Sequence, residues 1–245
     1  MFGKVALTLD RMGLRRLVAT AANLAYSDQR FSVDEQGRWV NAQAGGTIVS
    51  LEPHTYSLSN LRERILDEWC YKYTPGPEDI IVDAGAGIGE EALIFSPMVA
   101  SVVSIEAQPK TYSCLLETVR LSGLKNVRPV FAALADEEGT ARIDDAGIAS
   151  SILSGGGIEV PQITVRSLNL HRIDLLRMNI EGAERLAIYG VPWERVRNAV
   201  ISCHDFIGVP AKAEVREVLE REGFEIETTQ DAPEPWVRDY IYASR

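Results

Sequence analysis

Cysteine is scarce in this sequence of 245 residues, which contains only Cys70, Cys114 and Cys203. The number is odd and no two of them have CxxC spacing, so the pattern favours neither a disulfide framework nor a thiolate zinc site. A chain of this length can bury a core large enough to fold without such staples. We therefore expect a reducing compartment, and the cytoplasm as the location.

Positive charge and long apolar runs are also lacking. Lys and Arg number 25 against 35 Asp and Glu, a net charge of −10, and so acidic a surface repels nucleic acid. No apolar run reaches the ~20 residues of a membrane-spanning helix, because charges such as Asp10 and Arg15 interrupt residues 1–26. We expect no transmembrane segment and no signal peptide. Residues 1–26 predict an amphipathic helix packed on the protein, with contact to a membrane or a partner as the alternative.

The hydrophobic pattern divides the chain into two parts. Residues 1–77 predict the N-terminal helix, two short strands at 38–40 and 47–51, and a helix at about 59–73, and we interpret them as a cap. Residues 78–245 alternate strands with helices, which predicts a mainly parallel sheet covered on both faces. The expected strands lie at 80–84, 101–106, 127–132, 174–179, 199–204, 224–229 and 237–243, the last two as a hairpin. The expected helices lie near 88–95, 109–122, from 181 onward and 210–222. The stretch at about 136–168 breaks this alternation and predicts an excursion over one edge of the sheet or a flap.

The most informative segment is Val82-Asp83-Ala84-Gly85-Ala86-Gly87-Ile88-Gly89, where an expected strand runs into three glycines and a helix. Glycine lets the backbone turn sharply and approach a ligand closely. Open α/β sheets bind nucleotides at this position, outside the carboxyl ends of the strands. The segment therefore predicts a nucleoside site.

Two nucleoside cofactors compete for this turn. A dinucleotide uses G-x-G-x-x-G to hold its pyrophosphate, whereas the spacing here is G-x-G-x-G. Asp83 would repel a pyrophosphate and attract an ammonium group, and S-adenosylmethionine (SAM) carries an ammonium and a sulfonium but no phosphate. Glu106, at the end of the second strand, can accept hydrogen bonds from both ribose hydroxyls. We therefore favour SAM as the cofactor over NAD. The expected cofactor-binding residues are Asp83, Gly85, Ala86, Gly87, Gly89, Glu106, Ala107 and Ala133.

Three segments resemble the FkbM family of SAM-dependent methyltransferases. They are the glycine segment, Ile105-Glu106-Ala107-Gln108-Pro109, and Leu176-Arg177-Met178-Asn179-Ile180-Glu181-Gly182-Ala183-Glu184, which is similar to the signature Leu-Lys-Ile-Asp-Val-Glu-Gly-Ala-Glu. The resemblance covers roughly residues 75–206. It implies an α/β, Rossmann-like class I methyltransferase fold with a mainly parallel seven-stranded sheet, and methyl transfer mostly to oxygen. This chain departs from the pattern with Arg177 for Lys, Asn179 for Asp, and Asn169 where Asp is usual.

The candidate catalytic residues follow the expected strand ends. His204 is the best general base, because histidine titrates near neutral pH, and the adjacent Asp205 is placed to orient it. Asn179 can orient an acceptor hydroxyl, and the resemblance gives Glu181 a role in the site, although the helix dipole also explains an acid there. His54, in the cap, is a weaker candidate to reach substrate. Asn179, Glu181 and His204 could together ligate a divalent cation, but we expect no metal site because an amide replaces the charged ligand.

The sequence thus predicts a SAM-dependent methyltransferase that acts on a hydroxyl of a small molecule, natural product or glycan. Three alternatives stay open: an N- or carboxyl-methyltransferase on the same fold, a catalytically inactive SAM-binding protein, and a nucleotide-dependent oxidoreductase. Asp83 and the glycine spacing disfavour the oxidoreductase. The sequence allows a homodimer, and it does not identify the acceptor.

Overall fold

A seven-stranded sheet forms the centre of the computed structural model, which describes residues 13–144, 157–203, 211–227, 229, 237 and 240–245. The order of the strands is β12-β13-β11-β10-β4-β5-β6. Their bounds are β4 (Ile80–Ala84), β5 (Ser101–Glu106), β6 (Val127–Phe131), β10 (Ile173–Met178), β11 (Val196–Ser202), β12 (Glu225–Glu227) and β13 (Tyr240–Ser244). The five strands from β11 to β6 are parallel, and β13 is antiparallel to both of its neighbours. The predicted mainly parallel seven-stranded sheet is confirmed.

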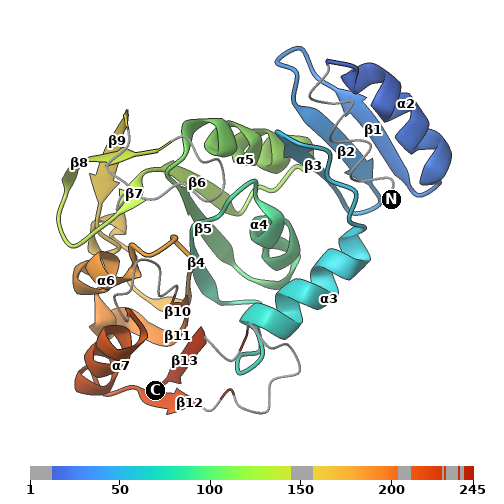
Figure 1. Cartoon of the computed structure of the whole chain (residues 1–245). Helices are drawn as coiled ribbons and strands as arrows, with labels where there is room; N and C mark the ends of the chain where they lie inside the picture. The colour runs from blue at the N-terminus through green and yellow to red at the C-terminus, as the bar shows by residue number, and fades with distance from the viewer. Residues whose placement is uncertain (1–12, 145–156, 204–210, 228, 230–236, 238–239) are drawn as a thin grey trace.

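Helices cover both faces of the sheet (Figure 1). They are α3 (Leu58–Trp69), α4 (Glu90–Phe95), α5 (Pro109–Leu121), α6 (Glu184–Ala187) and α7 (Ala211–Arg221), with short 3-10 turns η1 (Ser96–Met98), η4 (Arg166–Leu168), η5 (Ile188–Gly190) and η6 (Trp193–Arg195). Successive strand residues point to opposite faces. Ile81 packs into the cluster that includes α3 and α4, while Val82 packs into the cluster that includes α7. Both faces of β4 are therefore buried, as expected of a central parallel strand.

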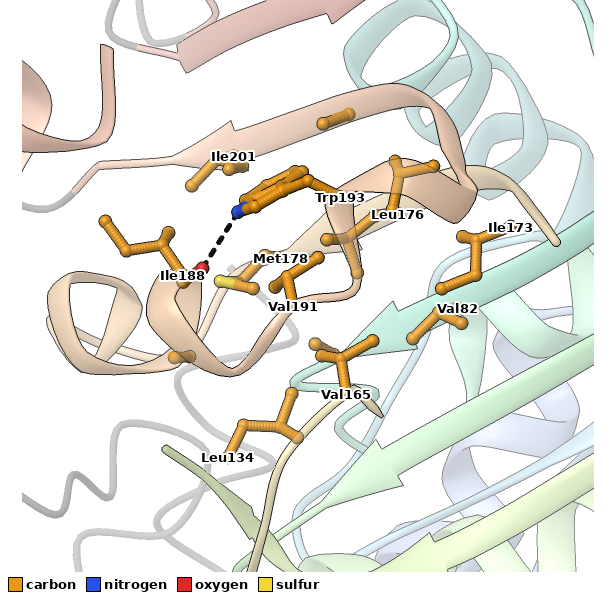
Figure 2. Close-up of a cluster of buried hydrophobic side chains, with 14 of the residues drawn as sticks. Val82, Leu134, Val165, Ile173, Leu176, Met178, Ile188, Val191, Trp193 and Ile201 are labelled. Carbon is orange, nitrogen blue, oxygen red and sulfur yellow. Dashed lines mark hydrogen bonds between the residues drawn. The ribbon is translucent and has the colours of Figure 1, made fainter. Parts of the chain in front are cut away.

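The larger of these two clusters lies between the sheet and the segment that follows α6 (Figure 2). Trp193 is its largest side chain, and the indole Nε1 donates a hydrogen bond of 2.9 Å to the carbonyl oxygen of Ile188. That bond satisfies the one polar atom of the ring where it is buried. Leu134 belongs to the same cluster and also reaches the cavity described below, so the core directly supports one wall of the site.

A separate three-stranded antiparallel sheet, of order β1-β2-β3, lies at the N-terminal end of the described chain. Its elements are α2 (Arg15–Ala25), β1 (Gln29–Val33), β2 (Trp39–Gln43) and β3 (Gly46–Ser50). Helix α2 packs Val18 and Ala22 against Phe31 and Trp39. Strand β1 was not expected from the sequence, and β2 extends beyond the strand expected at 38–40, because buried amides interrupt the apolar alternation that marks a strand.

The small sheet is fixed to the rest of the molecule at β3. The backbone N–H of Val49 donates to Thr118 Oγ1 at 3.0 Å, and the N–H of Thr47 donates to Ser122 Oγ at 2.9 Å. Two hydroxyls, one in α5 and one directly after it, thereby accept hydrogen bonds from N–H groups on the open edge of β3. Ile48 and Trp69 also enter the same hydrophobic cluster as Ile81. The N-terminal elements are therefore joined to the large sheet through a common core.

Part of the stretch at 136–168, which was expected to form an excursion or a flap, belongs to a second small sheet. Strands β7 (Ala133–Leu134), β8 (Gly139–Ile143) and β9 (Ile158–Ile163) pair in the order β7-β9-β8. Ala141, Ile143 and Val160 form its own buried cluster with Ala133. Residues 145–156 lie outside the described part of the chain. Strands β8 and β9 were not among the expected strands, because their short runs carry few apolar residues.

The strand order creates a crevice at one point. From β4 the chain first builds β5 and β6 on one side, and later adds β10 and β11 on the other. Ligands of open α/β sheets bind outside the carboxyl ends of the strands where the order reverses in this way. The carboxyl ends of β4, β5 and β10 therefore mark the site. Among the described residues, no helix combines the length and the apolarity needed to cross a bilayer.

Candidate cofactor and acceptor site

A cavity of about 540 Å³ opens at the carboxyl ends of β4, β5 and β10, in the size range of small-molecule sites. Its lining among the described residues comes from four places. The large sheet and its turns give Gly85, Ala86, Gly87, Ile88, Ile105, Glu106, Ala107, Arg177, Asn179, Ile180, Glu181 and Ala183; α4 gives Glu90 and Glu91; residues 132–143 give Ala132, Ala133, Leu134 and Ile143; and the N-terminal part gives His54, Tyr56, Arg64, Glu68 and Trp69.

The three glycines after β4 have three different reasons to be glycine. A Cβ on Gly85 would lie 1.9 Å from the carbonyl oxygen of Asn179, so this turn needs glycine to pass the end of β10. A Cβ on Gly89 would lie 2.8 Å from Leu115 Cδ1, so Gly89 packs against α5 and is not part of the lining. Gly87 has φ +54°, and a Cβ there would meet nothing within 4 Å. Only at Gly87 does the missing side chain leave space open to a ligand.

Glu106 ends β5 at the cavity wall. Its Oε2 accepts a hydrogen bond from the Gly87 N–H at 2.9 Å, and its Oε1 accepts one from the Gln108 N–H at 2.7 Å. Burial raises the pKa of Glu106 to about 7, against the lowering effect of these backbone donors. Each carboxylate oxygen has a further lone pair. The residue therefore ties the glycine turn to β5 and keeps capacity for two ligand hydroxyls.

Apolar side chains form the wall beside Glu106. Ala107 and Ala133, both predicted from the sequence, line the cavity there together with Ile105, Ala132 and Ile143. A flat aromatic base buries well against such a surface. The arrangement of a hydroxyl-binding carboxylate next to an apolar wall fits a nucleoside.

Asp83, which was expected to bind the cofactor, is not among the residues that line the cavity. Its side chain is fully buried, and Oδ1 accepts a hydrogen bond of 3.1 Å from Arg177, which lies opposite it in the register of β4 and β10. Arg177 also donates to Glu91 Oε1 at 3.0 Å and stacks over the Trp69 ring, 4.1 Å from its centre. Burial raises the pKa of Glu91 to about 7, even though the positive charge of Arg177 acts in the opposite direction. Asp83 is therefore linked to the glycine turn through Arg177, whose guanidinium also donates to the Gly85 carbonyl oxygen at 2.8 Å.

Asn179 and Glu181 follow β10 and line the cavity, as the sequence analysis expected of them. They do so from a turn, because Glu181 has φ +53° and α6 begins only at Glu184. The helix expected from residue 181 onward therefore begins three residues later. Glu184 is buried away from the lining and accepts a 2.8 Å hydrogen bond from the Ile180 N–H. Glu184 thereby holds the turn that presents Asn179 and Glu181.

Of the two candidate histidines, one lies in the part of the chain that the structure describes and the other does not. His204, predicted as the general base, lies with Asp205 outside the described residues, although β10 and β11 are neighbours as predicted. His54, the weaker candidate, lines the cavity and forms a 2.6 Å contact between Nε2 and Glu90 Oε1. Glu90 was not expected from the sequence, where its only local signal is its position directly after the glycine turn. Within the described residues, no three His, Cys, Asp or Glu side chains gather in a way that could hold a metal ion.

The comparisons with known proteins agree with this geometry. The profile described as the methyltransferase FkbM domain matches residues 83–226. The chain belongs to the FkbM methyltransferase family. Two fungal proteins are similar to it: methyltransferase sdnD of Sordaria araneosa, 27% identical over 72% of this chain and 85% of its own, and methyltransferase 1 of Beauveria bassiana (strain ARSEF 2860), 25% identical over 68% and 80%.

A solved member of the FkbM family has the same fold. The crystal structure of methyltransferase FkbM from Methylobacillus flagellatus KT superposes with a TM-score of 0.51 and 16% identity, over 69% of this chain and 44% of that one. FkbM membership makes the protein a SAM-dependent methyltransferase. The open space at Gly87, the hydroxyl-binding capacity of Glu106 and the apolar wall fit SAM, which supplies an electrophilic methyl group when bound.

Proposed function

We propose that this FkbM methyltransferase transfers the methyl group to a hydroxyl oxygen of a small molecule, natural product or sugar. The charge of the cavity carries this proposal. Among the described residues, the lining holds five glutamates and two arginines, and both arginines already face a glutamate. A carboxylate acceptor would meet repulsion there, whereas a neutral hydroxyl and a cationic methyl donor would not.

We assign the cofactor end to the wall around Glu106. Gly85, Ala86 and Gly87 give the backbone against which the methionine part fits, and Glu106 accepts hydrogen bonds from the ribose hydroxyls. The apolar side chains at Ala107 and Ala133 cover the base. Gly89 and Asp83 support this end indirectly, one by packing α4 on α5 and the other by pairing with Arg177.

We assign the acceptor end to the turn after β10 and to the cap. Asn179 orients the acceptor hydroxyl, and Glu181 lies beside it in the lining. Holding the hydroxyl in line with the methyl carbon supplies much of the catalysis, because alignment contributes about 7–11 kcal/mol in favourable cases. On this proposal residues 1–77 act as a cap over the acceptor and residues 78–245 as the cofactor domain.

The acceptor atom is tested by transfer of tritium. Protein, methyl-tritiated SAM and a small-molecule extract are incubated, and the labelled products are separated and treated with alkali. We expect labelled products that survive alkali and carry no new amine charge, as methyl ethers do. Release of labelled methanol would instead show a carboxyl acceptor, and labelled amines would show N-methylation. Glu106→Ala is the matched control, because it should abolish the label by weakening cofactor binding.

The same assay tests the absence of a metal. EDTA should leave the incorporation of tritium unchanged, because Asn179 offers an amide where a hard cation prefers a carboxylate. Complete loss of transfer in EDTA, restored by Mg²⁺ or Mn²⁺, would contradict this part of the proposal.

A further inference from the structure

His54 has one ring nitrogen bound and the other unpartnered. Nε2 lies 2.6 Å from Glu90 Oε1, while Nδ1 is buried and has no hydrogen-bond partner among the described residues. The ring lies in the cavity lining and meets the Tyr56 ring edge-on, with centroids 5.3 Å apart. A purely structural histidine satisfies both nitrogens, since a buried polar atom left unpaired costs about 1–3 kcal/mol. The unpartnered Nδ1 therefore points to a ligand group.

Glu90 decides which nitrogen of the His54 ring carries the hydrogen. Burial raises the pKa of Glu90, but His54, Arg64 and Arg177 together lower it below its usual value. The carboxylate is therefore ionised and can only accept hydrogen bonds. Nε2 of His54 must then be the donor, and in the neutral ring Nδ1 holds the lone pair.

The small N-terminal sheet holds the loop that carries His54. Asn41 Nδ2 donates to the carbonyl oxygen of His54 at 2.9 Å, and Gln29 Nε2 donates to that of Thr55 at 3.3 Å. Gln43 Nε2 donates to the Tyr56 carbonyl oxygen at 2.9 Å. Three successive carbonyls are thus fixed by three side-chain amides. This geometry also explains the buried amides that hid β1 and β2 in the sequence.

We propose that His54 is the general base that takes the proton of the acceptor hydroxyl, with Glu90 as the residue that positions it. This inference rests on the proposed O-methylation. Nδ1 accepts the hydroxyl proton while an oxygen lone pair forms the new bond to the methyl carbon. The bond from that carbon to sulfur breaks, and its electron pair stays on sulfur, so that the sulfonium becomes a neutral thioether. The imidazolium later releases its proton to solvent.

The tautomer of His54 tests the geometry without any acceptor. The chain has three histidines, so ring ¹⁵N spectra can be assigned with the variants His54→Gln, His171→Gln and His204→Gln. In the neutral form of the ring, we expect the Nε2–H tautomer for His54. Glu90→Gln should raise the share of the Nδ1–H form, because an amide can donate to Nε2. A predominant Nδ1–H form in the unchanged protein would overturn the inference.

Tritium transfer and binding of S-adenosylhomocysteine (SAH) together test the role as base. His54→Gln keeps a donor for Glu90 and should lower transfer about 10²–10⁴-fold, the usual contribution of a general base, with the affinity for SAH unchanged. His171→Gln is the matched control, since His171 is exposed and outside the cavity lining, and it should change neither value. Full transfer by His54→Gln, or loss of SAH binding in it, would overturn the inference. Absence of transfer by the unchanged protein would contradict the proposed function instead, and the tautomer would still decide the geometry.

Discussion

At the scale of single residues, the variant Gly87→Ala tests the cofactor contact, because it adds only one carbon atom, the Cβ. Gly87→Ala should weaken SAH binding about tenfold or more, because the Cβ would occupy space that we assign to the ligand, and tenfold corresponds to 1.4 kcal/mol. The positive φ adds a stability cost of about 1–2 kcal/mol. Calorimetric titration and thermal unfolding measure the two effects separately.

Gly123→Ala is the matched control for that variant. Gly123 has φ +66° and open space around a Cβ, but it follows α5 and is not among the cavity residues. It should lose similar stability and keep its full SAH affinity. Equal affinity in both variants would show that Gly87 does not face the cofactor.

Glu106 should make SAH binding depend on pH. With the pKa of Glu106 raised to about 7 by burial, the carboxyl is mostly protonated at pH 6 and ionised at pH 8. Ribose hydroxyls donate to the ionised form, so affinity should rise with pH and level off above 7, by at most about tenfold per unit. Glu106→Gln should flatten this profile. A profile that is equally steep in Glu106→Gln would assign the titration to another group.

Without ligand, the raised pKa of Glu106 should make the free energy of unfolding fall as the pH rises, which is opposite to its effect on SAH affinity. Glu106 contributes stability below its unfolded pKa, and that contribution is lost as the pH rises through about 7. Glu91 and Glu184 also have a pKa raised to about 7 by burial and act in the same direction. We expect SAH to protect the protein more against unfolding at pH 8 than at pH 6.

Some residues of the site could be predicted from sequence and others could not. Glu106 and Gly87 follow from local rules, since a strand end and a glycine turn place them. Asp83 was expected to face the cofactor because its actual partner could not be recognised in the sequence. That partner, Arg177, is 94 residues away and lies opposite Asp83 only through the register of two strands. His54 reaches the cavity by the same kind of long-range arrangement. Pairings between distant segments are what one sequence without relatives does not reveal.

At the scale of elements, the strands of the large sheet were the easiest to predict. The bounds of β4 and β5 agree with the sequence analysis, because long apolar runs next to glycine or a charge mark buried parallel strands. Strand β1 was missed because Gln29 is a buried polar residue paired with Asn41 at 2.8 Å. Strands β8 and β9 were missed because each is half exposed and buries little apolar surface.

Arg177 joins three elements, and replacing it should show how much this connection contributes to the free energy of unfolding. It bonds Asp83 of β4 and Glu91 of α4 from its place on β10. Arg177→Met should destabilise the protein by about 3–5 kcal/mol at pH 8, because both carboxylates stay buried without a cation. The loss should shrink toward pH 6, where Glu91 takes up a proton. Chemical denaturation at the two pH values measures both results.

Arg166→Met is the control for Arg177→Met. Arg166 also forms an ion pair, with Glu194, but both side chains are more than half exposed. Exposed pairs contribute about 0–1 kcal/mol, so this variant should stay close to the unchanged protein at both pH values. A similar loss in the two variants would mean that burial of the Arg177 network does not matter for stability.

At the scale of the whole molecule, one cavity joins two sheets. The large sheet supplies the glycine turn, Glu106 and the turn after β10, while the loop and helix after the small sheet supply His54 and Trp69. The general fold follows from strand order, and the sequence predicted it. The position of the small N-terminal sheet could not be predicted, because it depends on hydroxyls in and directly after α5 that accept hydrogen bonds from the edge of β3.

The most direct test of the account is calorimetric titration of the full chain with SAH and, separately, with NAD. We expect one SAH bound per chain and no heat with NAD. Glu106→Ala should lose about 1.5–3 kcal/mol for each hydrogen bond to the ribose. Binding of NAD without binding of SAH, or SAH binding that Glu106→Ala leaves unchanged, would contradict the assignment of this cavity to the methyl donor.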